Sequence, residues 1–367
     1  MSNYHFTYQN LATTISSSSG PTYITEEEFC YEKELVCFAL DRAYAGKGVI
    51  AEHLFLQVQQ QLTNLQWIKY PALWGTKLGE ILSTLPDAHL SVMLDQQICY
   101  QAKIEKRNVG KNRNQSDKPW KGFINNDIYT IAISSFPFGK WPGFAEFICE
   151  ARDKARTIII DVRGNGGGDS TNAHLMANLL ANQEVPLYAY GARRRNTPEA
   201  ITIFKNLLHF WQKHAEKNSS MLETIEKYIS ILEEKLQQAL QGDLAEFTEE
   251  YDQETDLTYN PHKGFQGKIY ILQDKGCASS GENAILAFNF FPNVEKVGFN
   301  SQGLINFGDI GSLQLPHSKL ILGIATFSTI FRGKKVEDFI GIKPDIILED
   351  GQDAFEYVYQ LESKNSI

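Results

Sequence analysis

The sequence predicts an α/β fold with a helical domain on its N-terminal side and a helical insertion. Three observations support this prediction. Short apolar strands alternate with helical segments from residue 128 onwards, and the strands at 157–161 and 268–272 lead into Gly- or Ser-containing turns. Apolar residues recur at three- and four-residue steps within 25–90, which is the period of amphipathic helices. The same period returns at 222–240 and interrupts the alternation of strands and helices.

The N-terminal quarter divides into a tail and a helical domain. We expect residues 1–24 to be an irregular tail, because a Ser-rich stretch there ends in Gly20 and Pro21. Thr25 is followed by three glutamates, an acid-rich start that suits the positive end of a helix. Residues 25–90 are therefore predicted to form a small helical domain.

The remainder of the chain is predicted to be the α/β core, over 91–350, and a C-terminal segment, over 351–367. The insertion covers 197–250 and is expected to hold two helices. Its role is open between a lid over a site and a packing hairpin with solvated charges. The core is expected to contain strands at 128–136, 157–161, 268–272 and 295–297, and helices at 143–155, 171–181 and 282–289.

Composition and charge argue against several classes of protein. The 367 residues carry a net charge of -9, whereas nucleic-acid binding usually needs a basic surface. The five cysteines are scattered without a CxxC pair, so we expect no metal site. No segment approaches the ~20 apolar residues of a membrane span. We expect no cofactor, and the oligomeric state stays open.

The start of the chain bears on localisation. Its first residues show neither a basic stretch nor a long apolar run, so a secretory signal is not recognised. We expect a cytoplasmic protein if Met1 is the natural start. A periplasmic or secreted protein is expected if a signal peptide has been removed.

A glycine-rich turn, Asp161 to Gly168, follows the strand at 157–161. Successive glycines let backbone N–H groups approach a bound group, which can be a phosphate or an oxyanion. The order GNGGGDS matches neither a Walker loop nor a dinucleotide fingerprint, so the phosphate interpretations are weak. Alone, the segment could equally be a structural turn.

A second turn, Cys277 to Glu282, lies between a strand and a predicted helix. A serine there can expose its hydroxyl above the sheet, and the amides that follow can bind an oxyanion. Alone, Ser279 and Ser280 would more often cap the helix. Cys277 has no evident partner that would lower its pKa, which favours a buried thiol over a nucleophile.

Together and in this order, the two turns resemble the tail-specific, C-terminal-processing serine peptidases, a family that includes the tricorn-type core proteases. The shared pattern is Asp-x-Arg-x-Asn-x-Gly-Gly followed by Ser-x-x-Glu. The resemblance runs from about residue 25 to 350. Four further segments resemble family motifs: Tyr-x-Gly at 41–46, Asp-x-His at 85–90, a strand ending in Ser-Ser-Phe at 129–136, and Gly-Ile-x-Pro-Asp at 336–345. Only 38 residues separate His89 from Ile128, too few for the PDZ domain that many members insert there.

The resemblance implies a crotonase-like β/α-spiral core, an N-terminal helical cap and a substrate cleft between them. It implies that Ser279 is the nucleophile. Backbone N–H groups of Ser280 and of Gly167 and Gly168 would form the oxyanion hole. Glu282 would be a structural hydrogen-bond acceptor. The other supporting residues would be Asp161, Arg163, Asn165 and Glu337.

The general base departs from the commonest family pattern. Many relatives place a Lys where this chain has Leu304, and a Leu cannot take up a proton. Tricorn-type members place a His on the strand that matches 129–133, and none occurs here. In relatives resembling the nisin-resistance peptidase, the Asp-x-His histidine faces the serine, and His89 occupies that place. His89 could instead stabilise the junction between cap and core; His174 is a poorer candidate for the base.

These observations predict a serine peptidase that cleaves peptide or protein substrates through an acyl-enzyme on Ser279, with His89 as general base. The substrate would bind along an edge strand. The alternative is an inactive family member that binds a peptide or an apolar ligand, as the missing Lys suggests. A crotonase-like enzyme acting on acyl-CoA is disfavoured by the Asp-x-His and Gly-Ile-x-Pro-Asp motifs.

Overall fold

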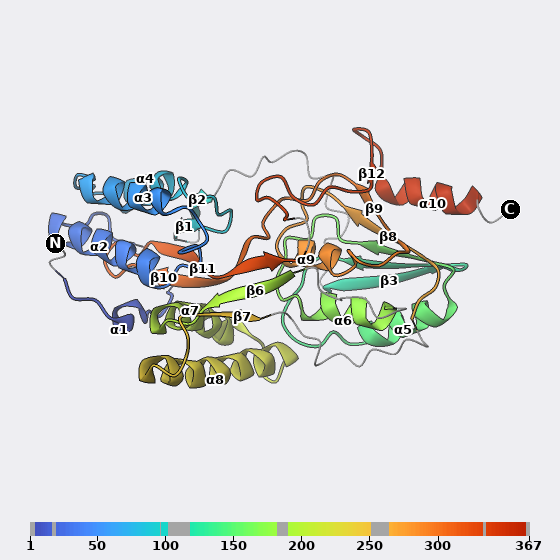
Figure 1. The fold of residues 1–367 in the computed structure, drawn as a ribbon, viewed down its shortest axis with the longest axis horizontal. Helices are drawn as coiled ribbons and strands as arrows, with labels where there is room; N and C mark the ends of the chain where they lie inside the picture. Colours follow the sequence, from blue (N-terminus) through green and yellow to red (C-terminus); the bar gives the residue numbers. More distant parts are fainter. Residues whose placement is uncertain are drawn as a thin grey trace. The chain divides into compact units, whose positions relative to one another are not determined.

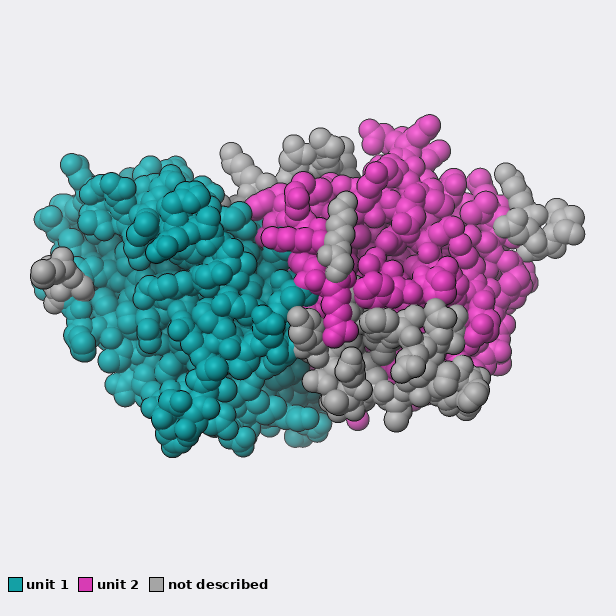
Figure 2. Space-filling view, viewed as in Figure 1, with its two compact units in different colours: residues 1–104, 192–250, 306–330 teal, residues 105–191, 251–305, 331–367 magenta. Residues whose placement is uncertain are grey.

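The computed structural model describes residues 4–16, 20–95, 97–101, 118–181, 190–250, 264–332 and 335–364, and within these ranges the fold is α/β with two sheets (Figure 1). The chain divides into two compact units (Figure 2). Unit 1 comprises residues 1–104, 192–250 and 306–330. Unit 2 comprises residues 105–191, 251–305 and 331–367.

Unit 1 begins with helices, as the sequence predicts. Thr25 and Glu28 form a capping box: the Thr25 hydroxyl accepts from the Glu28 N–H, and the Glu28 carboxylate accepts from the Thr25 N–H at 2.7 Å. The cap fixes the start of the long helix α2. The helices of this region are α1 (Tyr8–Leu11), α2 (Glu26–Arg42), α3 (Glu52–Asn64) and α4 (Pro71–Leu82).

The sheet of unit 1 has the strand order β2-β1-β11-β6-β7, with β10 paired to β11. Leu322 and Ile324 of β11 are fully buried, together with apolar side chains of α2 and α4. The strands are β1 (Ser91–Leu94), β2 (Gln97–Gln101), β6 (Tyr190–Arg195), β7 (Phe247–Glu250), β10 (Phe307–Gln314) and β11 (Ile321–Phe331).

The predicted helical insertion forms two helices, α7 (Pro198–His214) and α8 (Ser220–Gln241). Ile203 of α7 packs so closely on β10 that a Cβ at Gly311 would come within 2.5 Å of it. The insertion therefore groups with the N-terminal helices in unit 1, as does 306–330, whereas the sequence placed both within the 91–350 core. The cause is non-local pairing, because β11 pairs with β1.

Unit 2 is built on a sheet with the order β12-β9-β8-β5-β4-β3, parallel from β12 to β4 and closed by antiparallel β3. The alternation along β5 assigns its two faces: Ile158 and Ile160 point to one core cluster and Ile159 to the other. The strands are β3 (Trp120–Asn125), β4 (Ile128–Ile133), β5 (Thr157–Asp161), β8 (Lys268–Gln273), β9 (Val294–Gly298) and β12 (Ile346–Ile347).

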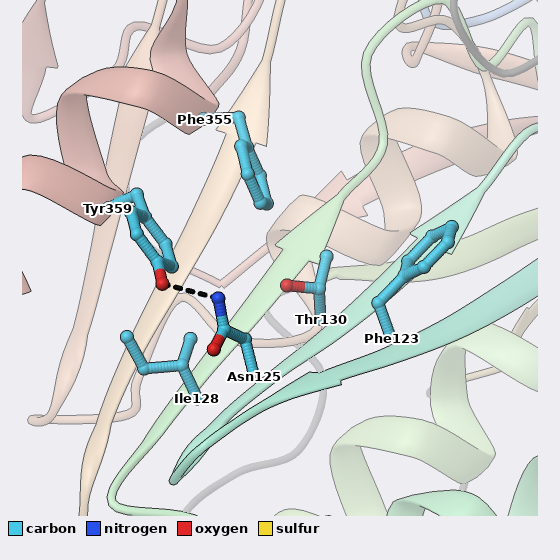
Figure 3. Close-up of a pocket in the computed structure, with 6 residues that line it drawn as sticks. All are labelled: Phe123, Asn125, Ile128, Thr130, Phe355 and Tyr359. Atoms are coloured by element: carbon cyan, nitrogen blue, oxygen red, sulfur yellow. Dashed lines mark hydrogen bonds between the residues drawn. The ribbon is translucent and has the colours of Figure 1, made fainter.

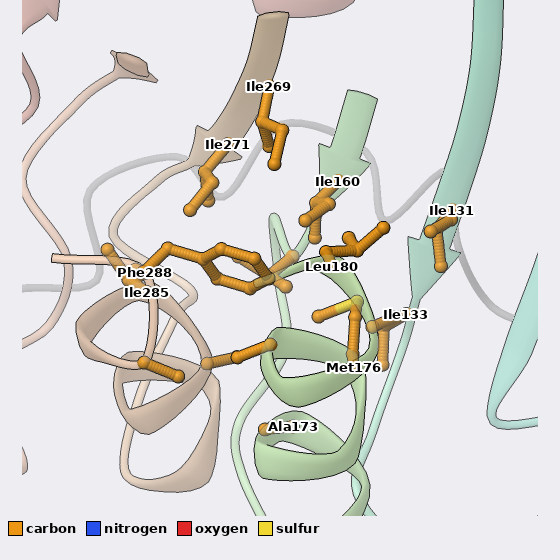
Figure 4. Close-up of a cluster of buried hydrophobic side chains, with 14 of the residues drawn as sticks. Ile131, Ile133, Ile160, Ala173, Met176, Leu180, Ile269, Ile271, Ile285 and Phe288 are labelled. Carbon is orange, nitrogen blue, oxygen red and sulfur yellow. The ribbon is translucent and has the colours of Figure 1, made fainter. Parts of the chain in front are cut away.

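Helices cover both faces of this sheet. Figure 4 shows Met176 and Leu180 of α6 and Ile285 of α9 meeting the isoleucines of β4, β5 and β8. On the other face, Val358 of α10 packs on Ile159 and its neighbours. The helices are α5 (Phe144–Lys154), α6 (Thr171–Leu180), α9 (Ser280–Leu286) and α10 (Ala354–Lys364). None of the helices within the described ranges is both long and apolar enough to cross a membrane.

Candidate functional site

The two turns singled out in the sequence meet at the carboxyl ends of the central strands in the sheet of unit 2. Strands β5 and β8 are parallel neighbours, with Asp161 opposite Leu272. The glycine turn follows the carboxyl end of β5, and the Ser279 turn follows that of β8. Loops at the carboxyl ends of parallel strands are where open α/β sheets bind ligands. Nine of the ten catalytic, oxyanion and supporting residues predicted by resemblance lie in this unit; His89 lies in unit 1.

Ser279 has an unusual backbone conformation, with φ 51° and ψ -119°. Non-glycine residues rarely adopt a positive φ, and such strain concentrates at functional sites. Two contacts hold the turn: the Ser279 N–H donates to the Leu304 carbonyl at 3.1 Å and to the Glu282 carboxylate at 3.1 Å. Ser279 is also the N-cap residue of α9, so the helix begins two residues before the predicted 282. The side chain of Ser279 remains half-buried.

Glu282 organises this region from a fully buried position. Besides the Ser279 N–H, its oxygens accept from the Ser301 hydroxyl at 2.6 Å, the Gly303 N–H at 2.9 Å and the Leu304 N–H at 2.7 Å. Burial raises the pKa of Glu282 to about 7, against these hydrogen bonds, which lower it. Leu304 thus contributes its backbone to the Ser279 turn, and its side chain is buried.

The glycine turn is held by the buried side chain of Asn165. Its amide donates to the Ile133 carbonyl at 3.1 Å, and its Oδ1 accepts from the Gly167 N–H at 2.9 Å. The Asn165 carbonyl accepts from the Ala278 N–H at 2.9 Å and ties this turn to the other. A Cβ at Gly167, where φ is 109°, would lie 2.9 Å from the Ser279 Cβ. The two turns are therefore in direct contact.

The N–H groups of Gly168 and Ser280, which lie in the two turns, have no acceptor among the described residues. The Gly167 carbonyl accepts from the Phe136 N–H at 3.0 Å. Because a trans peptide places C=O and N–H on opposite sides, the Gly168 N–H points away from Phe136. Of the two glycines predicted for an oxyanion hole, only Gly168 has its N–H available, since that of Gly167 is bound to Asn165.

The remaining predicted supporting residues differ in their surroundings. Arg163 forms a bidentate pair with buried Asp161, at 2.8 and 2.7 Å, and a third bond to Asp353 at 2.9 Å. These bonds connect the end of β5 to the start of α10. Glu337 is exposed, and its side chain makes no hydrogen bond or ion pair to any residue the structure describes.

The histidines lie in separate settings. His89, in unit 1, donates its backbone N–H to the Asp87 carboxylate at 2.7 Å. Its Nδ1 is buried without a hydrogen-bond partner within the described ranges, and burial lowers the pKa of His89 to about 4. His174, on α6 of unit 2, contacts the Tyr190 hydroxyl at 2.6 Å, and burial lowers its pKa to about 4 as well. Both rings are therefore neutral at pH 7. The pairing of His89 with Ser279 stays a prediction.

Cys277 is a buried thiol, as the sequence indicates. It is fully buried and donates to the Val162 carbonyl at 2.8 Å. Burial raises the pKa of Cys277 well above its ordinary value, so its thiolate is suppressed. Among the described residues no group of three or more His, Cys, Asp or Glu could hold a metal ion.

Three residues of this region were not singled out in the sequence: Ser170, Asn283 and Ser301. Ser301 bonds to Glu282, and Ser170 and Asn283 bond to each other at 2.6 Å. The only sequence signal is their position, Ser170 two residues after the glycines and Asn283 next to Glu282. Their contacts depend on the two turns meeting.

A shallow pocket of about 280 Å³ lies elsewhere in unit 2. Figure 3 shows Phe123 and Phe355 on either side of Thr130, and the Asn125 amide bonded to the Tyr359 hydroxyl. It contains none of the predicted site residues. Its lining comes from β3, β4 and α10: Phe123, Asn125, Ile128, Thr130, Phe355 and Tyr359.

The family model of peptidase family S41 matches residues 127–348. Mature CPAF is similar in structure, with a TM-score of 0.55 at 10% identity, covering 88% of this chain and 92% of that chain. Its complex with lactacystin gives a TM-score of 0.54 at 11% identity, covering 92% and 96%. A lipoprotein from Streptococcus agalactiae gives 0.47 at 14% identity, covering 92% and 96%. At these identities the likeness concerns the fold alone. No curated protein matches the chain.

Proposed function

The chain belongs to peptidase family S41, as the motifs predicted, and from this membership we propose that it is a serine peptidase with Ser279 as nucleophile. The observation that carries the proposal is the strained Ser279 turn with two unused N–H groups in the adjoining backbone, those of Gly168 and Ser280. A nucleophile needs an exposed, fixed hydroxyl and donors placed where negative charge develops.

The proposed reaction is acyl transfer to Ser279. Its Oγ attacks the scissile carbonyl while the Oγ proton passes to His89, the proposed base. The oxyanion of the tetrahedral intermediate accepts hydrogen bonds from the Gly168 and Ser280 N–H groups. The C–N bond then breaks, and the amine leaves with the proton from His89. A water molecule then attacks the acyl carbonyl and gives its proton to His89. The ester C–O bond breaks, and His89 returns the proton to the Ser279 Oγ, which restores the enzyme.

Burial lowers the pKa of His89 to about 4, so its ring is neutral at pH 7 and has a lone pair that can accept the proton. We place the peptide substrate along an edge strand, where main-chain hydrogen bonds give affinity independent of most side chains. We also propose, from the family resemblance, that the core is a crotonase-like β/α spiral with an N-terminal helical cap.

The test is hydrolysis of a fluorogenic peptide library by the wild type and by Ser279→Ala. We expect cleavage by the wild type and a loss of at least about 10³-fold in kcat for the variant. Equal activity in both proteins would refute the role of Ser279. A folded wild type that binds peptides without cleaving them would instead favour the alternative, a binding protein on the same fold.

A further inference from the structure

A chain of hydrogen bonds crosses from helix α9 to the glycine turn. The Asn283 amide donates to the Ser170 Oγ at 2.6 Å, Ser170 donates to the Ser280 Oγ at 3.0 Å, and Ser280 donates to the Gly168 carbonyl at 2.7 Å. All four residues belong to unit 2. The chain connects both residues whose N–H groups were assigned to the oxyanion.

The chemistry of the two ends fixes the direction of this chain. A carbonyl oxygen can only accept a hydrogen bond, so the Ser280 hydroxyl must be the donor to the Gly168 carbonyl. The Ser280 Oγ then accepts from Ser170, whose own Oγ accepts from the Asn283 NH₂. Each of the two hydroxyls therefore gives one hydrogen bond and receives one.

Ser170 does not perform the usual task of a serine in its position. It is the N-cap residue of α6, yet its side chain makes no capping hydrogen bond. The Asp169 carboxylate accepts from the Thr171 N–H at 2.9 Å instead. The Ser170 hydroxyl is thus committed to Ser280 and Asn283, which makes helix capping a poor account of it.

We propose that Ser170 is a positioning residue for the oxyanion hole, an inference that rests on the proposed peptidase function. Gly168 has φ 136° and lies so close to Phe136 that a Cβ would come within 1.9 Å of the Phe136 carbonyl. Its carbonyl is held by Ser280, and the following N–H, of Asp169, donates to that Phe136 carbonyl. By holding the Ser280 hydroxyl in place, Ser170 restrains the peptide between Gly168 and Asp169. This limits rotation at the Gly168 Cα, which joins that peptide to the one carrying the Gly168 N–H.

The experiment compares the wild type with Ser170→Ala, Ser280→Ala and the double variant, each by kcat and KM on a cleaved peptide. We expect Ser170→Ala to lower kcat about 10- to 100-fold, because a displaced donor weakens the transition state, with KM within about twofold. The double variant should be no slower than Ser280→Ala alone, because both changes break the same chain. Ser134→Ala, which removes a half-buried hydroxyl bonded to the carbonyls of residues 118 and 119, is the matched control and should keep the wild-type kcat.

Hydrogen exchange of the Asp169 amide supplies a readout that does not depend on turnover. Ser170→Ala should accelerate this exchange, and Ser134→Ala should not. An active wild type whose Ser170→Ala variant keeps its kcat, or loses kcat additively with Ser280→Ala, would overturn the role of Ser170 alone. A folded wild type that neither cleaves peptides nor reacts at Ser279 would overturn the proposed function, and the Ser170 role with it.

Discussion

Replacing Glu282 by Gln is expected to destabilise the fold far more than the loss of one charge suggests. Each carboxylate oxygen accepts two hydrogen bonds: Oε1 from Ser301 and Gly303, and Oε2 from Ser279 and Leu304. Gln has only one side-chain carbonyl oxygen, so its NH₂ group must take the place of one of the two carboxylate oxygens. That NH₂ group is itself a donor and then points at the two donors that this oxygen had accepted from. The site is fully buried, so water cannot compensate.

The Gln amide can be placed in two orientations, and the less costly one determines how much stability is lost. With the NH₂ in place of Oε1, the Ser301 hydroxyl can rotate, but the Gly303 N–H loses its acceptor. One orphaned buried N–H costs about 1–3 kcal/mol, and the remaining bonds lose their charge assistance. We therefore expect the free energy of unfolding to fall by about 2–4 kcal/mol at pH 8.5.

The assay is urea unfolding followed by tryptophan fluorescence at pH 8.5, where Glu282 is ionised given its pKa of about 7. Glu356→Gln, an exposed position in the first turn of α10, is the matched control and should change the free energy of unfolding by less than about 1 kcal/mol. A loss below about 1 kcal/mol for Glu282→Gln would refute the reasoning that four donors depend on this carboxylate.

Two further predictions concern the oxyanion donors and the base. Gly168→Ala should lower kcat by about 10²- to 10³-fold, because its Cβ would come within 1.9 Å of the Phe136 carbonyl. Gly166→Ala, whose Cβ would meet nothing within 4 Å, should keep wild-type kcat in the same peptide assay; equal losses in both variants would contradict the account. If His89 is the base, kcat/KM should rise with pH through about 4 and be level from pH 5.5 to 7, because His89 must lose its proton first. An acid limb centred near pH 6.5 would exclude His89 as that group.

Local patterns predicted the helices of 25–90 and the buried strands of unit 2, but not most strands of unit 1. The period of apolar residues predicted helical structure within 25–90, where α2, α3 and α4 lie, and the capping sequence at Thr25 predicted the start of α2. The apolar runs located β5 and β8, because a strand buried on both faces reads as a continuous apolar segment. Motif order predicted the family correctly.

Contacts between distant segments could not be predicted in the same way. Nothing in the sequence of 306–330 indicates that β11 pairs with β1 rather than with the strands of unit 2. Nor does GNGGGDS indicate that Asn165 takes the Gly167 N–H and leaves that of Gly168 unused. Both depend on which backbone groups meet after folding. The positive φ of Ser279 likewise follows from its bonds to Leu304 and Glu282.

The central claim, that Ser279 is an activated nucleophile, is tested most directly by fluorophosphonate labelling with mass-spectrometric mapping of the modified residue. The proteins are the wild type, Ser279→Ala and His89→Ala, with folding checked by circular dichroism. The account predicts a label confined to Ser279 in the wild type and no label in either variant. A folded wild type without a label, or a label on Ser279→Ala equal to that on the wild type, would contradict it.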